Sequence, residues 1–166
     1  MNNGAHYLDQ AFFAALPYVA FCTFFLVTIV RYRVRSFTYS SLSSQFLENK
    51  QHFWGLVPFH YGIIVVLTGH FVAFLVPREI LLWNSRPLRL YILEATGLAF
   101  GLLALIGLSA AVVRRVSVRK IARVTNHGDW VVLALLLVQI STGIAVAVFY
   151  PWGSSWFAAS AAPYLW

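Results

Sequence analysis

The stretch FWGLVPFHYGIIVVLTGHFVAFLVP, residues 53–77, decides the fold class of this 166-residue chain. It contains no Asp, Glu, Lys or Arg, and its 25 residues exceed the roughly 20 that a helix needs to cross a bilayer core. It carries two histidines, His60 and His70, five residues to either side of its midpoint at Val65. The sequence therefore predicts a transmembrane helix with one ionisable side chain in each leaflet.

The composition places the whole chain in the same class. Hydrophobic residues make up 60% and charged residues 10%, whereas a soluble domain has about 25% charged residues. These values exclude a soluble globular enzyme and a disordered chain. Three further apolar stretches are predicted to span the membrane: 11–30, 91–113 (uncharged from Ala95 onward) and 130–149. We therefore predict an all-α integral membrane protein, with one domain over residues 1–166.

The basic residues predict the orientation of the four spans. Four lie between the first two spans, three between the second and third, and five between the third and fourth. Because cytoplasmic loops carry the excess of Lys and Arg, both termini are predicted to lie outside. The net charge of +7 is then a topology signal and not a sign of nucleic-acid binding, although these cations can also contact anionic lipid or an acidic partner subunit. The first span lacks a preceding basic region and runs into Arg31, so we predict a retained helix and not a signal peptide.

The two intramembrane histidines carry the predicted chemistry. Ten helical residues place them about 15 Å apart along the axis and about 80° apart around it, so both can face one bundle interior. Cys22 is the only cysteine and Met1 the only methionine, which excludes c-type haem, an iron–sulfur cluster and methionine–histidine ligation. Histidine-ligated b-type haem remains, with a proton relay or a polar helix contact as alternatives.

The glycines nearby permit two interpretations. Gly62 and Gly69 lie beside the histidines, where they either admit a flat macrocycle or serve helix packing. The pair Gly97 and Gly101 in the third span also permits close helix contact.

A haem with two histidine ligands needs a second histidine at the same depth as the first. The other three histidines, His6, His52 and His127, are predicted near the membrane surfaces. We therefore expect the second ligands from another chain or from sequence not present in residues 1–166.

Several motifs together resemble a known family. They are Ser43-Ser44-Gln45, Phe59-His60, Gly62, Gly69-His70-Phe71 and Pro77, with Pro17-Tyr18, Arg31-Tyr32, Leu105-Ile106-Gly107, Arg114-Arg115, Gly128-Asp129, Gln139 and Gly143. These motifs resemble the gamma subunit of respiratory nitrate reductase, a membrane b-type cytochrome. The resemblance covers nearly the whole chain, and the two histidines ten residues apart are its most specific part.

The resemblance implies a five-helix bundle in the cell membrane with two b-type haems and no covalent catalysis. It implies that His60 ligates the inner haem iron and His70 the outer haem iron, and that Arg115 meets a haem propionate at the inner face. Quinol is then oxidised near the outer haem, where Gly69, His70 and Arg89 are the expected contacts. Electrons would pass to a cytoplasmic iron–sulfur subunit and a molybdenum catalytic subunit.

The fifth helix of the family, which carries the other two ligands, is not within residues 1–166. We expect a partial sequence, although a separate chain supplying the helix and a paralogue that binds less haem stay open. Alternative functions are a cytochrome b of a sulfur-metabolism or heterodisulfide-type complex, and a nitrite-oxidising complex with reversed electron flow. A haem-free membrane scaffold or proton-relay transporter is the alternative from another class.

Overall fold

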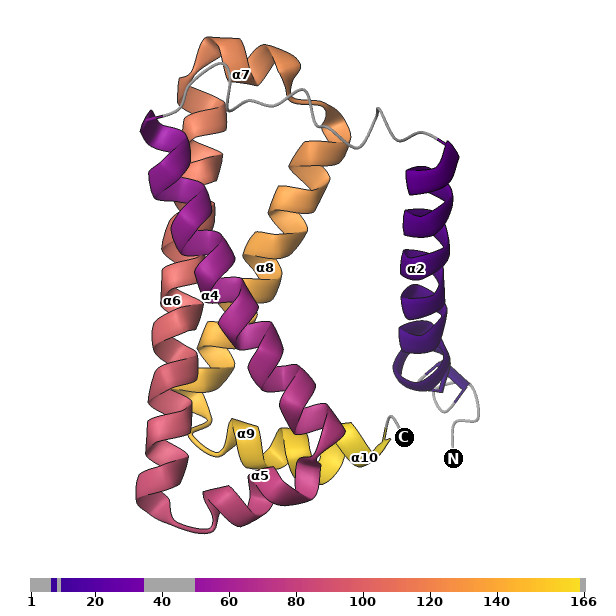
Figure 1. Ribbon diagram of the computed structural model, residues 1–166, viewed down its shortest axis with the longest axis vertical. Coiled ribbons are helices and arrows are strands. Elements are labelled where there is room, and N and C mark those ends of the chain that lie inside the picture. The colour runs from indigo at the N-terminus through magenta and orange to yellow at the C-terminus, as the bar shows by residue number, and fades with distance from the viewer. Residues whose placement is uncertain (1–6, 9, 35–49, 165–166) are drawn as a thin grey trace. The chain divides into compact units, whose positions relative to one another are not determined.

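The computed structural model describes residues 7–8, 10–34 and 50–164. The chain divides into two compact units, Met1–Ser43 and Ser44–Trp166, so the single domain over 1–166 stays a prediction. In the first unit a π-helical turn, η1 (Gln10–Ala15), continues into α2 (Leu16–Val34) (Figure 1). None of the residues in α2 is buried within the unit, as is typical of a helix whose apolar side chains face lipid.

The second unit contains three long helices and several short ones. They are α4 (Lys50–Leu75), α5 (Pro77–Asn84), α6 (Pro87–Ser117), α7 (Arg119–Val124), α8 (His127–Phe149), α9 (Gly153–Trp156), the π-helical η3 (Phe157–Ala161) and α10 (Ala162–Tyr164). Figure 1 shows α7 at one end of this unit and α5, α9 and α10 at the opposite end. We call these the α7 end and the α5 end.

Within the described residues, four helices are long and apolar enough to cross a membrane: Gln10–Val34, Phe53–Leu75, Pro87–Ser117 and His127–Phe149. They confirm the four predicted spans and the all-α fold class. The outward position of the N-terminus stays a prediction.

Two helix boundaries differ from the predicted ones because of proline. The second span ends at Leu75 and not at Pro77, since Pro77 opens α5. The third helix begins at Pro87, before the predicted residue 91. Proline is favoured in the first turn of a helix, where its missing N–H leaves no hydrogen bond unmade.

The helices α4 and α6 cross with their backbones in contact. A Cβ added to Gly62 would lie 2.6 Å from both the amide nitrogen of Ala104 and the carbonyl oxygen of Phe100. A Cβ added to Gly107 would overlap the backbone of Phe59 and the carbonyl oxygen of Gly55. Close approach at small residues is a main source of helix association in membranes, because lipid leaves little hydrophobic driving force.

A small buried cluster lies beside this crossing. Ala104 and Leu108 of α6 and Ile140 of α8 are 1%, 2% and 8% exposed. Phe59 and Ile63 of α4 pack against them, so the cluster joins all three long helices. The crossing and the cluster fix α4, and with it the height of both predicted histidine ligands in the bundle.

Candidate functional site

His60 and His70 make the same hydrogen bond on successive parts of α4. Nδ1 of His60 lies 2.7 Å from the carbonyl oxygen of Leu56, and Nδ1 of His70 lies 2.8 Å from that of Val66. Because a carbonyl oxygen only accepts, each Nδ1 carries the proton and donates it. In the neutral imidazole, Nε2 is then the nitrogen with a free lone pair. Metal-binding histidines have this arrangement, in which the second ring nitrogen donates to a backbone carbonyl or a carboxylate.

Both imidazoles are exposed on the surface of α4 within the unit, so each can accept a ligand. The two neighbouring glycines have different roles. Gly62 is buried in the α4–α6 crossing and serves helix packing. At Gly69 nothing lies within 4 Å of an added Cβ, which leaves open space next to His70. The packing interpretation therefore holds for Gly62, whereas a role for Gly69 in ligand binding stays a prediction.

Aromatic rings lie against both histidines. The ring of Phe59 is 5.2 Å from that of His60, and the ring of Phe157 is 5.3 Å from that of His70, each in an edge-to-face arrangement. Phe59 is the sequence neighbour of His60, but Phe157 comes from η3. The segment after α8 therefore lies at the α5 end and contacts the histidine there.

A polar cluster lies at the same end, and we call it the Glu94 cluster: Asn84, Glu94, Ser154 and Ser155. Oε1 of Glu94 accepts from the Ser154 amide at 3.0 Å and from its hydroxyl at 2.6 Å. Nδ2 of Asn84 donates to Oγ of Ser154 and Oγ of Ser155, both at 3.0 Å. The cluster thus joins α5, α6 and α9.

The Glu94 cluster was not predicted from the sequence. Its signal was present, since Glu94 is an acidic residue inside the predicted span 91–113 and intramembrane carboxylates are uncommon. The serine partners, 60 residues further along the chain, had no such signal.

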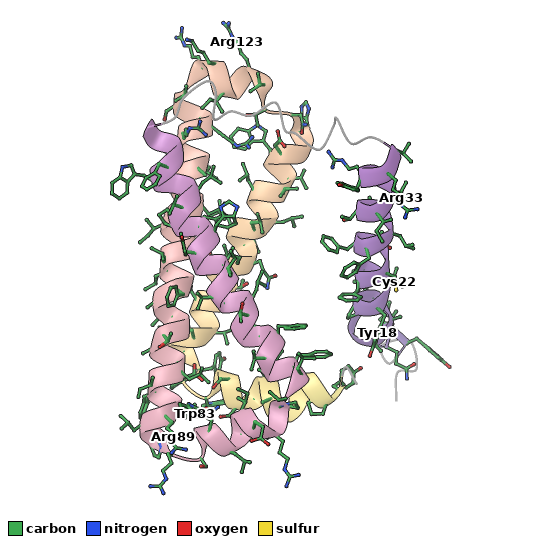
Figure 2. The ribbon with its side chains drawn as sticks, in the orientation of Figure 1. Tyr18, Cys22, Arg33, Trp83, Arg89 and Arg123 are labelled. Carbon is green, nitrogen blue, oxygen red and sulfur yellow. The ribbon has the colours of Figure 1, made fainter. Side chains whose placement is uncertain are left out.

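Arg89 lies in the first turn of α6 at the α5 end. Its guanidinium carbon is 5.1 Å from the centre of the Trp83 ring, a cation–π contact. Figure 2 shows Arg89 and Trp83 together at this end and Arg123 at the α7 end. Arg89 thus brings a fixed positive charge to the end of the unit that contains His70.

Comparison with known proteins identifies the family. Residues 9–166 match the family model described as nitrate reductase gamma subunit. This chain belongs to the nitrate reductase gamma subunit family. It is 29% identical over 144 residues to the respiratory nitrate reductase 1 gamma chain of Escherichia coli (strain K12), covering 86% of this chain and 64% of that relative.

Two other relatives agree with the assignment. The nitrate reductase gamma chain of Bacillus subtilis (strain 168) is 29% identical over 138 residues, which is 82% of this chain and 62% of the relative. The nitrate reductase-like protein NarX of Mycobacterium tuberculosis (strain ATCC 25618 / H37Rv) is 25% identical over 139 residues, 82% of this chain and 21% of the relative. The chain thus spans slightly under two thirds of the length of the E. coli and B. subtilis gamma chains.

In this gamma-subunit family member, Arg115 is held at the α7 end. Its Nη1 lies 3.4 Å from Oδ2 of Asp129 and donates to Oγ1 of Thr125 at 3.3 Å. Asp129 and Asn126 form a reciprocal capping box that starts α8. Arg115 therefore joins the end of α6 to the start of α8, and its contact with a haem propionate stays a prediction.

Few other side chains in the described residues could bind a metal ion. No group of three or more His, Cys, Asp or Glu in the described ranges is placed to hold a metal ion. His127 is the first residue of α8 and is exposed at the α7 end. His6 and the side chain of His52 lie outside the described part of the chain. His60 and His70 remain as the candidate ligands, each presenting one nitrogen.

Proposed function

We propose that this chain is a di-haem b-type cytochrome, the quinol-oxidising membrane subunit of a nitrate-reductase-like complex. The hydrogen bonds from Nδ1 of His60 and His70 to their own helix support this assignment most directly. They leave Nε2 of each imidazole free to bind iron and hold the ring in one orientation. His60 would hold the inner haem and His70 the outer one. A haem with two imidazole ligands supplies a one-electron redox centre whose potential depends on ligation and burial.

The two histidines suit haem by their ligand type and by their exposure. Neutral imidazole is a good axial ligand, and both rings are exposed on α4. The rise of α4 would place the two ligands about 15 Å apart along its axis, and the backbone contact at Gly62 would hold α4 against α6. The partner ligands would come from outside residues 1–166.

The α5 end would bind the quinol on the outer side of the cell membrane. The surface next to Gly69 and His70 would take the head group, and Arg89 would add a positive charge near it. Oxidation removes two electrons and two protons from the quinol. We propose that the protons leave on the outer side while the electrons pass inward to a cytoplasmic iron–sulfur subunit and a molybdenum catalytic subunit.

Single replacement of the two histidines tests the proposal. In the complete complex, His60→Ala and His70→Ala should each abolish a different one of two b-type haem signals in the reduced-minus-oxidised optical spectrum. His127→Ala is the matched control, because His127 is exposed in the first turn of α8, and it should keep both signals. Retention of both signals in His60→Ala and His70→Ala would refute the ligand assignment.

A further inference from the structure

The segment from α9 to η3 connects the carboxylate of α6 with the histidine of α4. Ser154 binds Glu94, and Phe157, three residues later, contacts the ring of His70. Residues three apart on a helix lie on the same face, about 5–6 Å apart at Cβ. We propose that Glu94 and Asn84 are positioning residues that hold Phe157 against the His70 imidazole and so fix the orientation of this ring. This inference rests on the proposed function, in which His70 is the outer haem ligand.

Glu94 is well suited to hold the segment. Its Oε1 accepts two hydrogen bonds from one residue, through the amide and the hydroxyl of Ser154. Hydrogen bonds to a carboxylate are roughly twice as strong as neutral ones. Glu94 is half-buried within a membrane-spanning helix, where an ionisable group is costly unless it has partners.

Asn84 adds a second attachment from α5. Both hydrogens of its amide are used, one on Ser154 and one on Ser155. The Ser154 hydroxyl therefore accepts from Asn84 while it donates to Glu94. This chain of bonds fixes Ser154 from two helices at once.

Backbone hydrogen bonds connect Ser154 to Phe157, and buried residues follow them. The amide of Phe157 donates to the carbonyl oxygens of both Gly153 and Ser154. Ala158 and Ala162, further along the segment, are 1% and 0% exposed. A displacement of Ser154 would therefore be transmitted to the Phe157 ring.

Two contacts restrain the orientation of the His70 ring. The bond from its Nδ1 to Val66 restrains the imidazole on one side, and the Phe157 ring, inclined by 77°, restrains it from another direction. The orientation and surroundings of an axial ligand tune the potential of the metal that it binds. The Glu94 cluster would thus act on the outer haem through the ring of its ligand.

The test compares Glu94→Ala and Ser154→Ala in the complete complex with Glu79→Ala, an exposed acidic residue of α5 at the same end. Amide hydrogen exchange of peptides covering residues 153–161 is measured first. Loss of a charge-assisted bond should speed exchange there about tenfold. A redox titration then measures the midpoint potential of the outer haem, identified as the signal that is lost in His70→Ala. Its midpoint potential should shift in both variants, while the His60 signal and the Glu79→Ala control stay unchanged.

Glu94→Gln keeps an acceptor oxygen. Its exchange protection and its outer midpoint potential should therefore stay close to those of the unaltered protein. This variant keeps the test valid if Glu94→Ala does not assemble. Normal exchange in both alanine variants would overturn the attachment. Faster exchange with an unchanged outer potential would overturn the effect on His70 and leave the proposed function standing. Retention of both haem signals in His70→Ala would instead refute the proposed function, while the exchange result still reports on the Glu94 cluster.

Discussion

Gly62 of α4 lies so close to Ala104 of α6 that a Cβ on Gly62 would stand 2.6 Å from the Ala104 amide nitrogen. The atoms that would be struck belong to the backbone of a helix and cannot rotate away. This contact sets the distance between the helix that carries both histidines and its main partner. The stability of the bundle and the placement of the proposed ligands thus depend on the same few atoms.

Gly62→Ala should therefore separate α4 from α6. Overpacking of this kind costs about 1–3 kcal/mol, so the midpoint of thermal unfolding in detergent should fall. Gly97→Ala is the control, since nothing lies within 4 Å of a Cβ at Gly97 and alanine is the better helix former. Equal unfolding midpoints for the two variants would show that the crossing tolerates a methyl group.

Gly69→Leu tests the open space next to His70. A leucine there would occupy the surface where we place the quinol head group, without touching the Nδ1 bond of His70. The rate of quinol-driven haem reduction should fall about tenfold, the effect of about 1.4 kcal/mol. Both haem signals should remain after reduction with dithionite. Gly143→Leu in α8, another position with no atom within 4 Å, should keep the normal rate.

The sequence predicts the spans well and singles out the two histidines, because both signals are local. An uncharged run of about 20 residues has few alternatives to a transmembrane helix, and an imidazole within it stands out. The helix faces are harder to assign, because side chains that face lipid and those that face another helix are both apolar. For this reason Gly62 was open to two interpretations. The sequence also indicated Gly97 as a contact position on α6, but the close contact is at Gly107, and a Cβ added to Gly97 would have no neighbour within 4 Å. The bond of Glu94 to Ser154 was missed because it joins residues 60 apart.

Arg115 lies at the α7 end, where the inner haem is proposed. Its ion pair with Asp129 is partly exposed, with side chains 26% and 40% accessible, so its loss should cost at most about 1 kcal/mol. If Arg115 also meets a propionate, Arg115→Gln removes a positive charge that favours the reduced haem. The potential of the His60 haem should then fall in a redox titration, with little change in the unfolding midpoint. Arg123→Gln, which changes an exposed cation of α7, is the control. An unchanged potential would leave Arg115 with a purely structural role.

Arg89, at the α5 end, either assists quinol binding or only anchors the start of α6. If its charge assists quinol binding, Arg89→Gln should raise the KM for quinol about tenfold, the effect of about 1.4 kcal/mol. Arg89→Lys should have a smaller effect, since it keeps the charge but not the planar group that lies over Trp83. Arg78→Gln, an exposed cation of α5, should leave KM unchanged. If Arg89 only anchors the start of α6 at the membrane interface, Arg89→Gln and Arg78→Gln will give the same KM. A change confined to Arg89 would instead assign its charge to the quinol, because both variants remove one positive charge from the same end.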